Sequence, residues 1–187
     1  MGSRYEATHG TNRQEARKYL GLFVLLLIFD ACLIAWHTVL IALSVKDMDH
    51  EVLIGLVIAT AHFLANSVAI SDIFFHLWNY TLSKGCDNFE PTKSSNCFLI
   101  SIVGGYADLA TIALAWASND EKQVMGLYVA MFAQSVLCAI VSISLYDWGK
   151  KASTKCSIAY KEDTEAGSIE DSRGGIVAIK VVSGRRR

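Results

Sequence analysis

Four polar side chains stand, one apiece, in four long apolar stretches of the sequence. They are Asp30, Asn66, Asp108 and Gln134, and each falls near the middle of its stretch if height is counted at about 1.5 Å per residue. Carboxyl and amide groups in an apolar setting can hydrogen bond to one another, hold a proton, or bind a cation. These four side chains are therefore the first candidates for chemistry.

Histidines and one more acid extend this set. We expect His37 and His62 in a second, more outward layer, and Asp72 and His76 nearer the cytoplasm. Because no Lys or Arg lies within the apolar stretches, the acids are expected to be protonated or to face water or a cation. The favoured interpretation is a structural hydrogen-bond network between helices. The alternative is a proton or cation path through Asp30, Asp108, His37 and His62.

Helical periodicity predicts which side of the second stretch is buried. At 100° per residue, one arc combines polar and small residues, namely Gly55, Ala59, His62, Asn66, Ala69, Asp72 and His76. This arc is expected to point into a helical bundle. Thr60, Ser67 and Ser71 lie nearly opposite, so we expect them to face lipid or a neighbouring protomer. In the third stretch, Gly104 and Gly105 stand beside Asp108 and predict close helix packing.

The stretches that carry these residues are long enough to cross a membrane. They cover residues 19–45, 52–78, 97–117 and 124–148, and none contains Lys, Arg or proline. A transmembrane helix needs about 20 apolar residues. With 52% hydrophobic and 19% charged residues, the chain is predicted to be all-α, a polytopic membrane protein with a four-helix transmembrane bundle and short outer connections.

The domain organisation follows from these stretches. Residues 1–18 are expected to form a cytoplasmic segment, 19–148 the transmembrane domain, and 149–187 a flexible cytoplasmic tail. Residues 161–175 are polar and acidic, so we expect disorder there. Cys156 is a candidate for palmitoylation, and Ser168 for phosphorylation directed by the acidic residues that follow it.

The distribution of positive charge predicts an orientation. Fifteen of the 17 Lys and Arg residues lie in the two terminal segments and the 79–96 connection. The positive-inside rule places these parts in the cytoplasm. One pattern disagrees, because Asn79 begins an N-x-T glycosylation sequon, and Cys86 and Cys97 could close a lumenal disulfide. We prefer reduced thiols and a chance sequon.

Several classes of function are not indicated. The sequence has no hydrolase, nucleotide-binding or metalloprotease motif, and its His and Cys residues lack metal-site spacing. We therefore expect no enzyme activity, no catalytic residues, no metal and no cofactor. A net charge of -1 gives no reason to expect nucleic-acid binding.

The third and fourth stretches carry a resemblance to a family. Residues 106–117, YADLATIALAWA, and residues 128–133, YVAMFA, resemble the MARVEL and Casparian-strip-like group of four-span proteins. That group often has an acid before a small-residue run in its third span, and both its termini are cytoplasmic. A basic residue usual in the first span of Casparian-type members is absent, and Asp30 lies in that helix instead. The resemblance implies a role in organising membrane subdomains, junctions or vesicles.

The expected function is therefore non-enzymatic. We expect a scaffold or an oligomerising component of a membrane domain, cell junction or trafficking vesicle. Its expected partners are the lipid bilayer and either further copies of the chain or other membrane proteins. The alternative is an oligomeric proton or cation channel that uses the intramembrane Asp and His residues. The sequence does not distinguish plasma membrane from endomembrane.

Overall fold

The chain forms four α-helices in a computed structural model that describes residues 4–44, 50–83, 89–117 and 122–172. The helices are α1 (Arg4–Ser44), α2 (His50–Leu82), α3 (Pro91–Ala117) and α4 (Lys122–Ser172). Every one of them is long and apolar enough to cross a membrane. The predicted all-helical fold with four apolar helices is confirmed.

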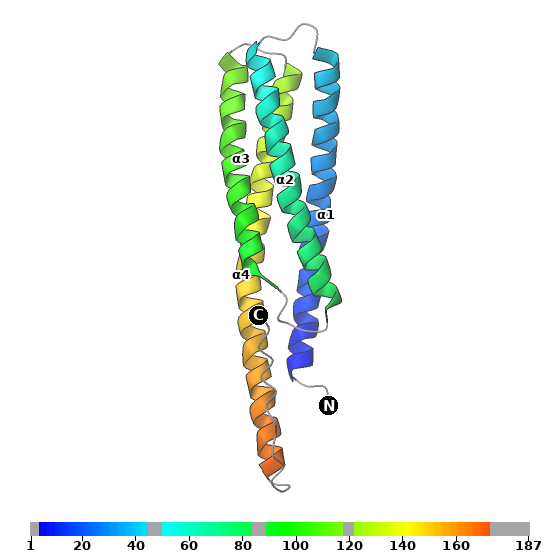
Figure 1. The fold of residues 1–187 in the computed structure, drawn as a ribbon, viewed down its shortest axis with the longest axis vertical. Helices are drawn as coiled ribbons and strands as arrows, with labels where there is room; N and C mark the ends of the chain where they lie inside the picture. Colours follow the sequence, from blue (N-terminus) through cyan, green and yellow to red (C-terminus); the bar gives the residue numbers. More distant parts are fainter. Residues whose placement is uncertain (1–3, 45–49, 84–88, 118–121, 173–187) are drawn as a thin grey trace, which may run out of the picture.

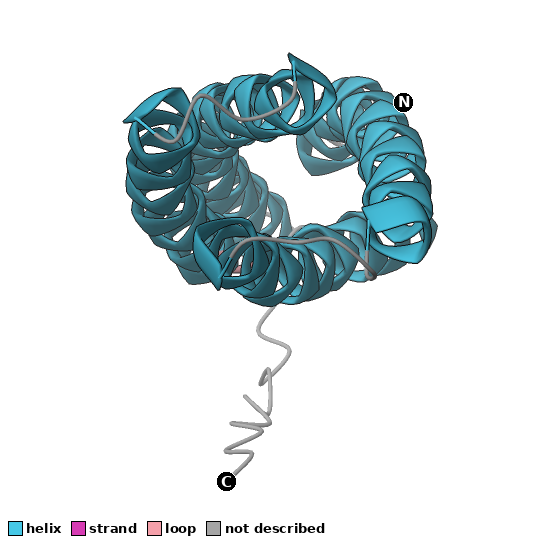
Figure 2. Ribbon diagram, turned by 90° about the horizontal axis from the view of Figure 1, so that it is seen from above, coloured by secondary structure: helices cyan, strands magenta, loops and turns pink. Residues whose placement is uncertain are grey.

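The four helices run up and down and pack in the order of the chain. α1 packs on α2 and α4, and α3 packs on α2 and α4, so the helices form a closed ring (Figure 2). The start of α1 and the end of α4 lie at the same end of the bundle, which we call the terminal end (Figure 1). α4 extends well past the other helices at that end.

The helices extend furthest beyond the apolar stretches at the start of α1, the start of α3 and the end of α4. α3 begins at Pro91, where a proline suits the first helical turn because its missing N–H would be unbonded there. α1 begins at Arg4, and α4 continues to Ser172. The predicted disorder of residues 161–175 is therefore wrong as far as Ser172.

Contacts between α1 and α4 account for part of this extension. Asn12 Nδ2 donates to the Ala152 carbonyl at 3.5 Å, and Arg4 pairs with Glu162. Trp148 Nε1 donates to Glu15 at 2.6 Å. Polar composition alone predicts disorder because it gives no weight to a neighbouring helix that can supply such partners.

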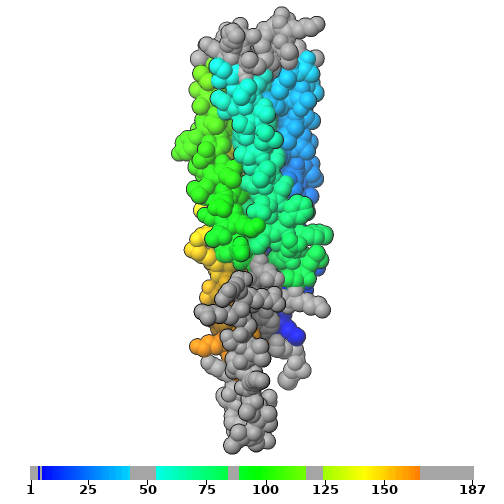
Figure 3. Space-filling view, viewed as in Figure 1, coloured from blue at the N-terminus to red at the C-terminus, as the bar shows by residue number. Residues whose placement is uncertain are grey.

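The bundle buries several polar side chains and exposes many large apolar ones. On α2, Leu64 and Val68 are 66% and 69% exposed, whereas Asn66 between them is fully buried. In the space-filling view, α1, α2 and α3 form the face toward the viewer (Figure 3). Water disfavours large apolar side chains on a surface, so this distribution fits a hydrocarbon surrounding.

Two apolar clusters fill the interior. One lies toward the terminal end and includes Phe23, Ile70, Leu77 and Leu145. The other lies toward the opposite end and is made by Leu33, Leu40, Ala59, Phe63, Ala115, Val124, Leu127, Tyr128 and Met131. Between them along α1, α3 and α4 come Asp30, Asp108 and Gln134, all buried. The fold therefore encloses a polar layer between two apolar ones.

Candidate functional site: a buried polar layer

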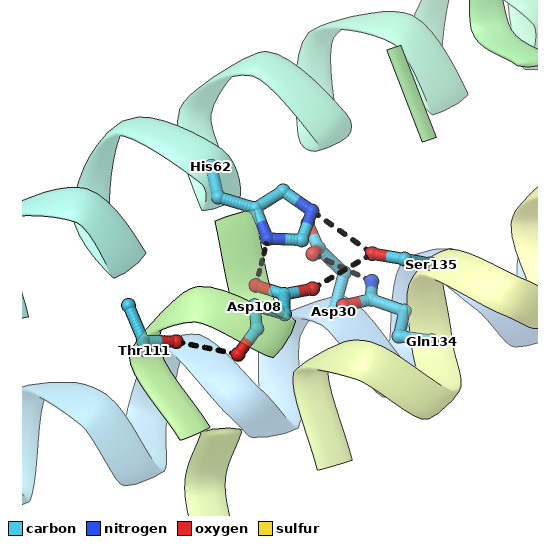
Figure 4. Close-up of polar contacts among 6 residues, drawn as sticks. All are labelled: Asp30, His62, Asp108, Thr111, Gln134 and Ser135. Atoms are coloured by element: carbon cyan, nitrogen blue, oxygen red, sulfur yellow. Dashed lines mark hydrogen bonds and ion pairs between the residues drawn. The ribbon is translucent and has the colours of Figure 1, made fainter. Parts of the chain in front are cut away.

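His62 and Asp108 form the centre of the polar layer, together with Ser135 (Figure 4). His62 Nδ1 lies 2.7 Å from Asp108 Oδ1, and His62 Nε2 lies 3.2 Å from Ser135 Oγ. Ser135 Oγ donates to Asp108 Oδ2 at 3.0 Å. The three side chains, from α2, α3 and α4, thus close a ring of three polar contacts.

The number of hydrogens in this ring identifies its charge. Ser135 has one hydroxyl hydrogen, which it gives to Asp108, so His62 Nε2 must carry a hydrogen to bond to Ser135. The contact between His62 Nδ1 and Asp108 then needs a third hydrogen, on either atom. With a hydrogen in each of the three contacts, the His62–Asp108 pair holds two protons and carries no net charge. Neutrality removes most of the penalty of burying the aspartate in a low-dielectric interior.

Asp30 is the second centre of the polar layer. Its Oδ1 accepts a hydrogen bond from Gln134 Nε2 at 2.7 Å, and its Oδ2 accepts one from Ser67 Oγ. α1, α2 and α4 thus meet at this carboxyl group. Gln134 lies directly before Ser135 in α4, so the two centres are adjacent along that helix (Figure 4). Gln134 thus contacts Asp30, and His62 contacts Asp108, as in a hydrogen-bond network between helices.

Two further predicted residues are buried but lie outside both centres. His37 Nε2 lies 2.9 Å from Thr60 Oγ1, and the His37 ring packs on Phe63 at 5.4 Å between centroids. Phe63 also stacks on His62 at 6.3 Å. Neither polar atom of the buried Asn66 side chain makes a hydrogen bond within the described residues. His37 therefore forms a separate pair with Thr60, next to Phe63.

Asp72 and His76 do not belong to the polar layer, which corrects the prediction. Asp72 is 55% exposed and pairs with Lys93 Nζ at 2.9 Å. His76 Nε2 accepts a hydrogen bond from the Glu90 backbone N–H at 2.8 Å. The expectation that Asp72 lacks a basic partner is also wrong. Helix α3 begins at Pro91, before its apolar stretch, and so brings Lys93 alongside α2.

The two predicted packing glycines have different surroundings. A Cβ added at Gly104 would lie 2.6 Å from His62 Nε2, whereas a Cβ at Gly105 would lie 3.6 Å from Ser135 Cβ. The first distance is a clash and the second is an ordinary contact. Gly104 therefore makes room for the His62 ring, and Gly105 has space for a methyl group.

Sequence reasoning missed the hydroxyl partners. Ser67 and Thr60 are expected from the sequence to face lipid or a neighbouring protomer. Both contact α1 side chains, and Thr60 is nevertheless exposed. Ser135 was not singled out. A hydroxyl residue is frequent in membrane helices, and only the position of Ser135 beside Gln134 could have suggested a role. Ser71 makes no side-chain hydrogen bond within the described residues.

The Ser135–His62–Asp108 set contains the residue types of a hydrolase triad but has a different geometry. In such a triad the serine lies on the far side of the imidazole from the carboxylate. Here Ser135 bonds to both His62 and Asp108, and all three residues are buried. The hydroxyl hydrogen is aimed at the carboxylate, and the ring is closed on itself. This arrangement favours helix association over nucleophilic attack.

The remaining predicted sites lie toward the terminal end. Cys97 is a free thiol whose Sγ lies 3.6 Å from Cys138 Sγ, and Cys86 falls outside the described residues. Cys156 is 3% exposed and disulfide-bonded, so it offers no accessible thiol for the predicted palmitoylation. Ser168 lies in the last part of α4, where side chains are not described. The described residues contain no group of three or more His, Cys, Asp or Glu side chains able to hold a metal.

The fold and the buried layer define a class of protein: a four-helix bundle with an apolar exterior and a polar layer within its interior. Comparisons of the chain with known protein families, with curated proteins and with solved structures find no match. The structure and the chemistry of the polar layer are therefore the basis for any statement about function.

Proposed function

We propose that this chain is an integral membrane protein that crosses the bilayer four times. The observation that carries the proposal is the distribution seen on α2 and repeated on the other helices. Asp30, Asn66, Asp108 and Gln134 are buried, whereas large apolar side chains on the same helices are exposed, among them Leu25, Leu64, Val103 and Leu137. A soluble bundle requires the reverse arrangement. Resistance of the protein to alkaline carbonate extraction from membranes tests the insertion.

We further propose a non-enzymatic role as a scaffold or an oligomerising component of a membrane domain, junction or vesicle. The ring of contacts at Ser135 supports this role, because each of its contacts joins two helices. The resemblance of residues 106–117 to the MARVEL and Casparian-strip-like group agrees with such a role. Gentle extraction followed by native mass measurement should recover oligomers or complexes. Recovery of a monomer alone, at all detergent strengths, would contradict it.

The alternative is an oligomeric proton or cation channel. The specific observation in its favour is the presence of Asp30, His62 and Asp108 in one buried layer. Against it, apolar clusters lie on both sides of that layer within a protomer. Reconstituted wild-type protein distinguishes the two proposals: a channel gives a current that Asp30→Asn or Asp108→Asn alters, and a scaffold gives none.

We propose that the terminal end is cytoplasmic, on the basis of its excess of Lys and Arg. Two features of this end are typical of a lumenal side instead. Asn79 begins a glycosylation sequon, and Cys156 is disulfide-bonded, which reducing compartments disfavour. A mobility shift of the native protein on glycosidase treatment decides between them. A shift that is lost in Asn79→Gln would reverse the orientation.

A further inference from the structure

A cleft of about 550 Å³ lies between α1 and α4 close to the terminal end. Each helix contributes four residues at the i, i+3, i+4, i+7 spacing of one helical face. These are Glu15, Lys18, Tyr19 and Leu22 from α1, and Ser144, Asp147, Trp148 and Lys151 from α4. The cleft is therefore built from two complete helix faces.

The lining of the cleft changes from charged to apolar along the bundle axis. Because α1 and α4 are antiparallel, Glu15 and Lys151 lie at the outer end, and Leu22 and Ser144 lie at the inner end. Tyr19 and Trp148 are in between, with ring centroids 5.6 Å apart. Tyrosine and tryptophan prefer the boundary between lipid headgroups and hydrocarbon. The cleft thus extends across the boundary between the lipid headgroups and the acyl chains.

The charged groups of the cleft are balanced and largely unpaired. Lys18 and Lys151 form no ion pair with any described carboxylate, and Asp147 forms none with any described base. Glu15 accepts the Trp148 indole N–H at 2.6 Å, which fixes the tryptophan as one wall. Tyr19 donates to the Ser144 carbonyl at 3.3 Å. Two ammonium and two carboxylate groups therefore line the cleft beside a fixed aromatic wall.

We propose that this cleft binds the headgroup of a zwitterionic glycerophospholipid. Lys18 and Lys151 contact its phosphate, Asp147 and Glu15 face its ammonium group, and an acyl chain runs past Leu22. The two carboxylates select against an anionic head of the same size, because a like charge without a partner ammonium is repelled. The proposal rests on the proposed insertion in a bilayer, which sets Tyr19 and Trp148 at the headgroup level.

The test uses the full-length protein, delipidated in mild detergent and titrated with phosphatidylethanolamine or phosphatidylglycerol under native mass spectrometry. Wild-type protein should prefer phosphatidylethanolamine. The double variant Lys18→Gln, Lys151→Gln should lose about tenfold or more in affinity for it. The variant Lys150→Gln, Lys155→Gln removes the same charge from the same end of the bundle but does not line the cleft, and its affinity should be unchanged.

A third variant reports on selectivity. Asp147→Asn removes one carboxylate and leaves both lysines, so it should shift the preference toward phosphatidylglycerol. Equal or tighter binding of phosphatidylglycerol by the wild-type protein overturns the proposal, as does equal loss in the two lysine double variants. Carbonate extraction of the same protein separates this result from the proposed insertion: a membrane-resistant protein with no headgroup preference refutes the cleft alone.

Discussion

His62 Nδ1 lies 2.7 Å from Asp108 Oδ1, and both side chains are almost completely buried. The pair joins α2 to α3, and Ser135 ties it to α4. With a hydrogen in each of these contacts the pair carries no net charge, which lowers the cost of burying it. His62, Asp108 and Ser135 thus connect three helices through one set of buried contacts.

The first prediction concerns the coupling within this pair. His62→Leu and Asp108→Leu should each destabilise the bundle, by about 3 kcal/mol, because each leaves a buried polar partner unsatisfied. The double variant should lose at least about 1 kcal/mol less than the sum of the two single losses. Unfolding in mixed micelles followed by circular dichroism measures all three. Strict additivity would mean that the two side chains do not interact.

The second prediction compares two neighbouring glycines. Gly104→Ala should destabilise the protein by about 1–3 kcal/mol, because the added methyl group displaces the His62 ring from its position beside Asp108. Gly105→Ala has an ordinary contact at 3.6 Å and should change the stability by less than about 0.5 kcal/mol. Thermal unfolding in detergent gives both values. Equal effects of the two substitutions would contradict the orientation of His62 toward Gly104.

Much of the architecture could be predicted because it depends on composition alone. Long apolar stretches without Lys or Arg indicate spanning helices, and fixed rise per residue sets Asp30 and Gln134 at one height. The rotation of each helix could not be predicted in the same way. In a ring of four, each helix contacts two neighbours, so α2 has polar contacts on two faces, through His62 to α3 and through Ser67 to α1. Periodicity identified the face of His62 and assigned the other face, with Ser67, to lipid.

The ends of the helices also could not be predicted from the sequence. The apolar stretch at residues 97–117 gave no sign that α3 starts at Pro91, and the pairing of Lys93 with Asp72 depends on that additional turn. The start of α1 and the end of α4 could not be predicted either, because there the two helices contact each other beyond their apolar stretches. Polar extensions of membrane helices are fixed by tertiary contacts, which a single sequence does not display.

The third prediction concerns the end of α2. Arg13 donates to the Thr81 carbonyl from Nε at 3.0 Å and from Nη2 at 2.6 Å. No basic residue lies in the last turn of α2, so Arg13 supplies the positive charge that a helix C-terminus favours. Arg13→Gln should destabilise this turn by about 1–2 kcal/mol. Hydrogen exchange at residues 79–82 should accelerate. Arg17→Gln, at an exposed position of α1, is the control and should leave that exchange unchanged.

The fourth prediction tests the packing of α3 against α4 inside the bundle. Cys97 Sγ and Cys138 Sγ lie 3.6 Å apart, and a disulfide needs an approach to about 2 Å. Iodine, an oxidant that enters apolar regions, should therefore link the two thiols. The reaction forms the S–S bond, releases two protons and reduces iodine to iodide. Trypsin then cuts after Lys93, Lys122 and Lys150, so the product is a linked pair of peptides, residues 94–122 and 123–150.

Cys32 is exposed on α1 and serves as an internal control that should not join either peptide. If Cys32 forms the major cross-link, or if the two peptides stay separate while both thiols remain alkylatable after denaturation, the register of α3 on α4 is different. Such a difference would also separate Ser135 from Asp108, because these residues lie on the same two helices.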